Sequence, residues 1–336
     1  MLHGALIGLG QVAMNGHLPA WKSRSDFQII AGIDSAEVRT DLFKKEMPQA
    51  AVYKSLEDCL AQEKIDFVDI ATPPHTHFNL IKESLRAGLN VLCEKPLVLK
   101  PEELKEIEFA AQESNKVLIT VHNWKYAPIC RKISELILSG AIGQVQRLEW
   151  YVLRSGPSIT TEKDNWRLNP EMSGGGILVD HGWHAFYLIL EWLSASPKKI
   201  RAELENRQYE DLPVEDTAKI KIEFNGGSNA RADILLTWAS RLRKNSGLIE
   251  GTEGRILMED DRLIVEHKGR PAETISFEKA LSAGSFHADW FGFVIDEFAE
   301  EVKNPALEKN FKIAQSCFHL IQKSKESSEK RAEVLF

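Results

Sequence analysis

One short stretch of the chain places an acid, a lysine and a proline directly after a run of apolar residues. Val91 to Cys93 is typical of a buried strand, and Glu94, Lys95 and Pro96 follow it. Pro96 ends strand pairing and disfavours helical angles for Lys95, so we expect an extended lysine. At the carboxyl end of a parallel strand, such a lysine can stabilise negative charge on a substrate oxygen. Taken alone, the stretch would equally suit a surface lysine in a loop.

A second stretch combines three glycines, an aspartate and histidines. Gly174 to Gly176 precede an expected helix that begins near Gly176, on which Asp180 and His184 would share one face and His181 another. A histidine beside a carboxylate can transfer protons near neutral pH. For an isolated pair, a buried hydrogen bond at a domain junction is the more common role. A metal site that adds His181 is a third and less favoured interpretation, because the helix separates the two histidines.

A third stretch is rich in glycine and lies near the start of the chain. Gly8 allows a tight turn, Gly10 allows a pyrophosphate to approach the backbone, and Ala13 is small enough for a following helix to pack. An expected strand over 27–33 ends at Asp34, 24 residues after Gly10, which suits a carboxylate that binds a ribose. Because its charge would repel a 2′-phosphate, we predict NAD over NADP. Arg39 is the residue that would favour NADP instead.

The elements around these stretches fall into two classes. In residues 1–122, short apolar strands alternate with helices, which predicts a parallel, doubly wound sheet. After residue 122 the period changes to two, which predicts an α+β domain over 123–336 with an open antiparallel sheet. Its expected strands lie at 147–152, 218–224 and 231–238, a turn at 225–227, and amphipathic helices at about 287–302 and 310–325. The polar face of that sheet is either solvated or a contact with a second copy.

Composition narrows the function classes. The chain has 336 residues and a formal net charge of −7 without a basic block, which argues against a nucleic-acid partner. No apolar run reaches membrane-spanning length and no leader is evident, so we expect a cytoplasmic protein without a membrane partner. The four cysteines lack paired spacing and are expected to be reduced. His75 and His77 lack further local ligands, so lining a cofactor cleft is preferred to a metal site and no metal is expected.

Together these motifs resemble the glucose–fructose oxidoreductase and inositol dehydrogenase family (Gfo/Idh/MocA). The resemblance rests on residues 8–13, 72–75, 94–96, 166–167, 174–176, Asp180 and His184. It implies a nicotinamide cofactor on a Rossmann domain and a substrate between that cofactor and the open sheet. It also implies that Lys95 lies by nicotinamide and substrate, and that Asp180 and His184 serve proton transfer. Dimers or tetramers through the sheet are common in the family.

We therefore predict an NAD-dependent dehydrogenase that acts on a secondary alcohol of a sugar, polyol or sugar derivative. The expected catalytic residues are Lys95, His184 and Asp180. The expected cofactor-binding residues are Gly8, Gly10, Gln11, Val12, Asp34, Thr72, Pro73, His75, Glu94 and Lys95. The expected substrate-binding residues are Lys95, Trp124, Tyr126, Arg154, Trp166, Arg167, Asp180 and His184, since aromatic rings suit sugars and arginines suit carboxylates or phosphates.

Two other classes of function remain open from the sequence. One is a glycosidase that retains NAD and oxidises its sugar only transiently, which net reduction of added NAD would exclude. The other is a non-catalytic dinucleotide sensor, which would not need Lys95 or His184. We also expect a homo-oligomer, a dimer or tetramer, that pairs through the C-terminal sheet.

Overall fold

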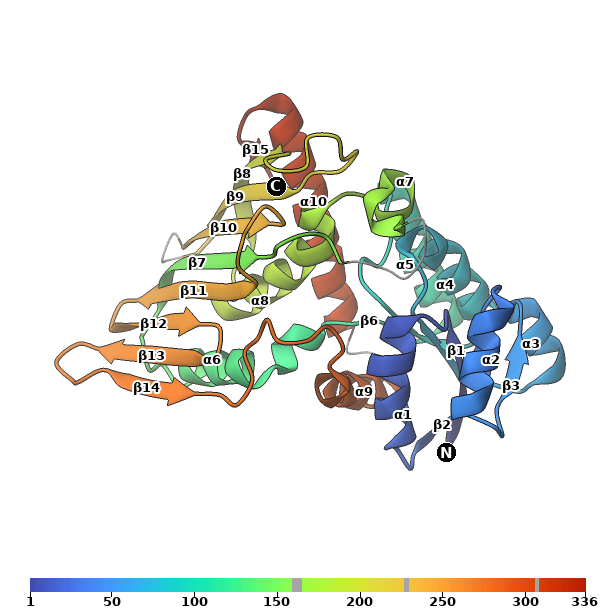
Figure 1. Ribbon diagram of the computed structural model, residues 1–336. Helices are drawn as coiled ribbons and strands as arrows, with labels where there is room; N and C mark the ends of the chain where they lie inside the picture. Colours follow the sequence, from blue (N-terminus) through green and yellow to red (C-terminus); the bar gives the residue numbers. More distant parts are fainter. Residues whose placement is uncertain (159–164, 227–229, 306–307) are drawn as a thin grey trace. The chain divides into compact units, whose positions relative to one another are not determined.

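The computed structural model describes residues 1–158, 165–226, 230–305 and 308–336, and these residues form two compact units (Figure 1). Unit 1 comprises Met1–Asn123 and Phe286–Gln315, and unit 2 comprises Trp124–Ser285 and Ser316–Phe336. The expected turn at 225–227 lies partly outside the described residues.

Unit 1 contains a parallel sheet of six strands in the order β3-β2-β1-β4-β5-β6. Its strands are β1 (Leu2–Ile7), β2 (Phe27–Ile33), β3 (Ala51–Tyr53), β4 (Phe67–Ile70), β5 (Asn90–Cys93) and β6 (Leu118–Thr120). Every neighbouring pair runs parallel, and the alternation with helices makes the sheet doubly wound, as predicted. All four strand ends that carry expected site residues therefore meet at one edge of the sheet.

The helical segments of unit 1 follow the strands. They are η1 (Ala13–His17, a π turn), α1 (Leu18–Lys22), α2 (Glu37–Glu46), α3 (Leu56–Gln62), η2 (Pro74–Thr76), α4 (His77–Arg86), α5 (Pro101–Ser114) and α9 (Ala288–Lys303). Ser55 caps α3, because its side-chain oxygen accepts the Asp58 N–H at 3.1 Å. Pro101 occupies the first turn of α5, where no backbone donor is needed.

Helix α9 packs in unit 1, which differs from the expected division at residue 122. Its Phe298 ring lies 5.9 Å from Phe27 and 5.7 Å from Phe67, and its Phe291 ring stacks on His17 at 3.8 Å. Figure 1 shows α9 beside α1. Aromatic contacts of this kind bury large apolar areas, so the chain returns to the first unit near its end.

Unit 2 contains a sheet of nine strands, counted in the described residues, in the order β14-β13-β12-β11-β7-β10-β9-β8-β15. Its strands are β7 (Val145–Leu153), β8 (Pro197–Glu205), β9 (Thr217–Phe224), β10 (Arg231–Thr237), β11 (Lys244–Gly251), β12 (Gly254–Glu259), β13 (Arg262–His267), β14 (Glu273–Ser276) and β15 (Val334–Leu335). The sheet is mixed rather than fully antiparallel, because β7 and β10 pair in parallel. All its other neighbouring pairs are antiparallel.

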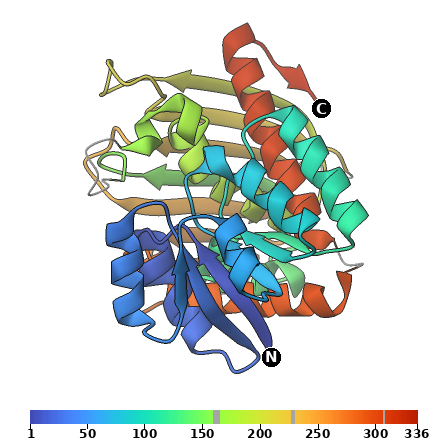
Figure 2. The same cartoon turned by 90° about the vertical axis from the view of Figure 1, so that its right-hand side faces the viewer.

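One face of this sheet is covered by helices. The buried side chains of β7 are Leu148, Trp150 and Val152, and α8 packs against that strand. Figure 2 shows α10 in front of the strands, and Ser327 of α10 accepts the Ala202 N–H of β8 at 2.9 Å. The helical segments that unit 2 uses are η3 (Asn123–Tyr126), α6 (Pro128–Leu138), η4 (Trp166–Leu168), α7 (Pro170–Ser173), η5 (Leu178–Gly182, a π turn), α8 (Trp183–Leu193) and α10 (Lys309–Lys330, which begins in unit 1).

Two further expectations concern the cysteines and the membrane. Cys59, Cys93, Cys130 and Cys317 are all buried and unpaired, as predicted. Among the described residues, no helix is both long enough and apolar enough to cross a bilayer.

Candidate functional site

The glycine loop of unit 1 is held against the neighbouring strand end. The Gly8 N–H donates to the Ile33 carbonyl at 2.8 Å, and Gly8 has a φ of +87°. A Cβ at Gly8 would lie 2.6 Å from Thr72 Cγ2, whereas a Cβ at Gly10 would meet only Arg39 Nη1 at 3.8 Å. Gly8 is therefore required by the turn, and Gly10 leaves open backbone where a phosphate can approach.

Asp34 stands at the end of β2 beside this loop. Its Oδ2 accepts the Leu9 N–H at 2.8 Å and its Oδ1 accepts the Ala36 N–H at 2.9 Å. Arg39 of α2 lies 3.4 Å from Oδ2. The carboxylate is thus oriented by backbone donors, as a ribose-binding acid requires, and Arg39 lies close enough to reduce its effective charge.

The loop after β4 contains the expected residues Thr72, Pro73 and His75. Thr76 Oγ1 donates to the Thr72 hydroxyl at 2.7 Å, and the buried His77 contacts the Thr72 carbonyl at 2.9 Å and the Pro96 carbonyl at 2.8 Å. His75 is exposed. It is therefore His77 that ties this loop to the Glu94-Lys95-Pro96 stretch.

Glu94 and Lys95 follow β5 at the same sheet edge. The Glu94 N–H donates to the Ile70 carbonyl at 2.8 Å, which extends the pairing with β4 by one residue. Glu94 Oε2 accepts the Lys95 N–H at 3.0 Å. The glutamate side chain therefore holds the backbone of the lysine that carries the expected chemistry.

His17 ends η1, in the helical segment expected after Ala13, and the sequence analysis did not identify it as a site residue. Its Nδ1 lies 3.0 Å from Asp69 Oδ2 and its Nε2 lies 3.1 Å from Glu94 Oε1. Burial alone would lower the pKa of His17, but the two carboxylates outweigh it and raise the pKa to about 9. The Trp21 indole N–H also donates to Asp69 at 2.7 Å. The acid Asp69 inside an apolar strand is the one sequence signal that a buried polar partner exists.

In unit 2, the three-glycine stretch is anchored by a half-buried acid, Glu215. Glu215 Oε1 accepts the Gly176 N–H at 2.9 Å and the Leu178 N–H at 3.0 Å. A Cβ at Gly176 would lie 1.9 Å from the Glu215 carbonyl oxygen. Lys325 of α10 donates to the Gly174 carbonyl. Glu215 thus caps the first turn of the segment that carries Asp180 and His184.

The expected helix begins with a π turn, which changes the partners of its polar residues. Asp180 Oδ2 lies 3.2 Å from His181 Nδ1. The α-helical spacing predicted that His181 would lie on another face from Asp180, whereas the two side chains are neighbours. His184 Nδ1 lies 2.9 Å from the Tyr187 hydroxyl. Tyr187 is thus an orienting partner of His184 that sequence reasoning did not identify.

An aromatic ring completes this cluster. The Trp124 ring stacks on the buried His184 ring with centres 4.5 Å apart. The backbone N–H of Trp124 donates to the Tyr187 hydroxyl at 2.8 Å. The guanidinium carbon of Arg154, also buried, lies 6.0 Å from the Trp124 ring centre. The structure thus brings together three of the expected substrate-binding residues of unit 2: Trp124, Arg154 and His184.

Two further cation–π contacts in unit 2 involve expected substrate-binding residues. The Arg167 guanidinium lies 4.3 Å from the Trp166 ring centre, and the Lys125 ammonium lies 4.9 Å from the Tyr126 ring centre.

Comparison with known proteins bears on these two units. Residues 2–122 match the model of an oxidoreductase family with an NAD-binding Rossmann fold, and residues 130–257 match the GFO/IDH/MocA C-terminal domain. The chain belongs to the GFO/IDH/MocA oxidoreductase family. Unit 1 is accordingly an NAD(P)-binding Rossmann domain, to which Phe286–Gln315 returns.

Members of this family with known sequences include two that match about half to two thirds of the chain. An uncharacterized oxidoreductase of Schizosaccharomyces pombe is 30% identical over 66% of this chain and 59% of its own length. The D-glucoside 3-dehydrogenase of Escherichia coli is 29% identical over 54% of this chain and 51% of its own length. The match thus spans less than two thirds of either of these curated relatives.

A solved structure shares the fold over nearly the whole chain. It is an oxidoreductase from Agrobacterium radiobacter in complex with NAD+, L-tartaric acid and magnesium. It is 20% identical, covers 99% of this chain and 98% of its own, and has a TM-score of 0.85. In this chain, the described residues include no group of three or more histidine, cysteine, aspartate or glutamate side chains that could hold a metal ion.

Proposed function

We propose that this protein is an NAD-dependent dehydrogenase that acts on a secondary alcohol, or the corresponding ketone, of a sugar, polyol or sugar derivative. The observation that carries the proposal is the buried His184, oriented by the Tyr187 hydroxyl at 2.9 Å and stacked on Trp124. The family, and the activity named for the Escherichia coli relative, support the choice of a sugar hydroxyl.

His184 is the proposed general base. When Nδ1–H donates to the Tyr187 hydroxyl, Nε2 is the unprotonated nitrogen that can take the proton of a substrate hydroxyl. Tyr187 can accept this bond while it also accepts the Trp124 N–H, because a phenolic oxygen has two lone pairs. Tyr187 is thus a positioning residue that selects the tautomer of the base.

Lys95 and Asp180 have supporting roles in this proposal. A cationic Lys95 hydrogen-bonds the hydroxyl oxygen and stabilises the negative charge that develops on it. Asp180, which pairs with His181 at 3.2 Å, stabilises the positive charge that the His184 imidazole acquires or holds the substrate. A bound nicotinamide dinucleotide supplies the hydride acceptor, and the open backbone at Gly10 together with Asp34 suits that ligand.

A panel of sugars and polyols, followed by NADH absorbance, tests the proposal. We expect net reduction of added NAD by the wild type, which the NAD-retaining glycosidase would not give. His184→Asn should bind NADH normally and turn over about a hundredfold or more slowly, and Lys95→Met should lose at least as much turnover. Tyr187→Phe should fall between the wild type and His184→Asn. Near-normal turnover of His184→Asn and Lys95→Met would contradict the site assignment and favour the sensor.

A further inference from the structure

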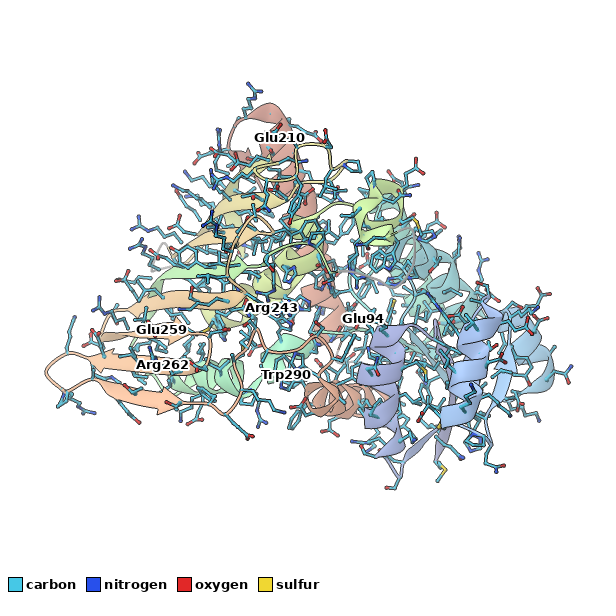
Figure 3. The ribbon with its side chains drawn as sticks, in the orientation of Figure 1. Glu94, Glu210, Arg243, Glu259, Arg262 and Trp290 are labelled. Carbon is cyan, nitrogen blue, oxygen red and sulfur yellow. The ribbon has the colours of Figure 1, made fainter. Side chains whose placement is uncertain are left out.

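Two arginines lie just beyond strand ends at one end of the nine-stranded sheet. Leu153 at the end of β7 is opposite Thr237 at the end of β10 and Lys244 at the start of β11. Arg154 directly follows Leu153, and Arg243 directly precedes Lys244. Figure 3 shows Arg243 next to the start of β11. The sheet register therefore brings together two residues that are far apart in the sequence.

Arg154 is buried and has no carboxylate partner among the described residues. Only 3% of its surface is exposed, and its Nη1 donates to the Leu153 carbonyl at 2.8 Å and to Asn245 Oδ1 at 3.0 Å. In the part of the chain that the structure describes, all acceptors of this guanidinium are uncharged and its buried Nε has no partner. Burial and the nearby Arg243 lower the pKa of Arg154 to about 10. Because a buried cation without a carboxylate partner is costly, binding of an anion to it is favourable.

Arg243 places a second positive charge next to the first. Its Nε donates to the Ser282 carbonyl and its Nη2 to the Gly284 carbonyl, both at 2.7 Å. No ion pair is formed by Arg243 with the residues that the structure describes. The neighbouring Asp260 is already occupied, because its two oxygens accept the Asn245 N–H at 3.1 Å and the Ser282 hydroxyl at 2.6 Å.

The same arginine pair borders the proposed reaction site in unit 2. The Trp124 ring centre lies 6.0 Å from the Arg154 guanidinium carbon and 4.5 Å from the His184 ring centre. The guanidinium and the imidazole are therefore separated by no more than the sum of these two distances. One small molecule can reach both groups.

We propose that Arg154, supported by Arg243, binds a carboxylate of the substrate, so that the preferred substrates are sugar acids such as aldonates or uronates. This inference rests on the proposed function and narrows its substrate class. A planar guanidinium matches a carboxylate with two parallel hydrogen bonds. Because Asp180 and Asp260 lie within electrostatic range of Arg154, the site suits a monoanion better than a phosphate dianion.

Matched pairs of compounds test the substrate class. We would measure kcat and KM with NAD for epimeric hexuronates against the parent hexoses, and for aldonates against the corresponding polyols, with hexose 6-phosphates as a third arm. We expect kcat/KM for the best acid to exceed that of its neutral partner at least about tenfold, the range of a charge-assisted hydrogen bond. A preference for the neutral compounds or for the phosphate esters would overturn the inference.

Variants of the two arginines test the residues. Arg154→Gln should raise KM for the acid about tenfold or more, and it should lower kcat/KM for the acid much more than kcat/KM for the neutral partner. Arg154→Lys should retain part of the preference for the acid over its neutral partner. Arg243→Gln, at an exposed position, should weaken this preference as well, and it tests the inference if Arg154→Gln does not fold. Arg207→Gln, which removes an exposed arginine paired with Glu205 at 2.6 Å, is the matched control.

The outcomes separate this inference from the proposed function. If neutral sugars are oxidised without any advantage for acids, the dehydrogenase stands and the carboxylate site does not. If the arginine variants impair acids and neutral compounds equally, the arginines are structural and the inference fails. If no compound of any class reduces added NAD, the proposed function itself fails, and the inference with it.

Discussion

His17 shows how a single buried side chain couples the charges of unit 1. It lies between Asp69 and Glu94 and stacks on Phe291, so its imidazole is shielded from water while both ring nitrogens face carboxylates. The same carboxylates favour the protonated ring, and His17 in turn keeps the pKa of Glu94 below its usual value although burial alone would raise it. The protonated histidine therefore fixes the glutamate that holds the Lys95 backbone.

This arrangement predicts a stability that depends on pH. The pKa of His17 is about 9 in the folded chain and 6.5 for an ordinary histidine, as in the unfolded chain. Protonation of His17 therefore contributes its full stabilisation of the folded state below pH 6.5, and this contribution is lost as pH rises through about 9. The shift corresponds to roughly 3 kcal/mol. The stability difference between wild type and His17→Gln in urea unfolding should therefore shrink between these pH values. The exposed His75→Gln is the control, and a difference that does not change with pH would contradict the prediction.

Asp34 determines the expected choice of cofactor. Because its carboxylate is oriented by the Leu9 and Ala36 N–H groups, it can accept ribose hydroxyls and repel a 2′-phosphate. Asp34→Ala should weaken NADH binding by about tenfold and favour NADPH, as read from nucleotide fluorescence titrations. Asp41→Ala on the exposed side of α2 should change neither the affinity for NADH nor the affinity for NADPH. Tighter binding of NADPH by the wild type would mean that Arg39, 3.4 Å from Asp34, recognises the phosphate instead.

At the level of elements, two helical segments that follow glycine-rich loops contain a π turn. The π turns are η1, which ends at His17, and η5, which contains Asp180. A π turn widens the helix and shifts the following side chains relative to an α-helix.

The loop before η5 should tolerate little change. A Cβ at Gly176 would overlap the Glu215 carbonyl, so Gly176→Ala should displace Glu215 and lower the thermal midpoint by several degrees. Gly292→Ala in α9, where a Cβ meets nothing within 4 Å, is the matched glycine control. It should be neutral or stabilising, by about 0.5–1 kcal/mol, because alanine favours helix. Equal midpoints for the two variants would show that the Gly176 backbone can move freely.

At the level of the whole molecule, the uncovered face of the nine-stranded sheet is of mixed character. Leu248, Leu257 and Ile264 lie opposite one another on β11, β12 and β13 and form an apolar row. Toward β9 the same face carries ion pairs, among them Arg147 with Glu250 at 3.3 Å. The polar face that the sequence predicted carries Arg147, Lys219, Lys221, Arg231 and Asp233, whereas the apolar row was not predicted. Apolar side chains between paired charges suit a contact with an identical face.

We therefore predict a closed homo-oligomer that forms through this face. The double variant Leu248→Glu with Leu257→Glu should dissociate it, since burying unpaired carboxylates costs several kcal/mol. Leu242→Glu, at a leucine that is 61% exposed outside the strands, should leave the assembly intact. Light scattering at micromolar concentration measures both, and a wild type that is only monomeric would rule the prediction out.

Much of the architecture follows from local patterns in the chain. Period-two strands and the glycine turn at Gly8 depend on backbone geometry and on near neighbours, so they were predicted at nearly the correct positions. The Glu94-Lys95-Pro96 stretch was placed at the carboxyl edge of the sheet for the same reason. These features need no knowledge of distant residues.

The partners of the site residues were decided only by tertiary structure. His17 meets Asp69 and Glu94 because parallel crossovers bring three separate strand ends together, and Arg154 meets Arg243 because the sheet register does so. The return of α9 to unit 1 and the parallel pairing of β7 with β10 likewise depend on long-range packing. Patterns with a period of 2 or 3.6 report which face of an element is buried, but carry no information on which distant element will cover it.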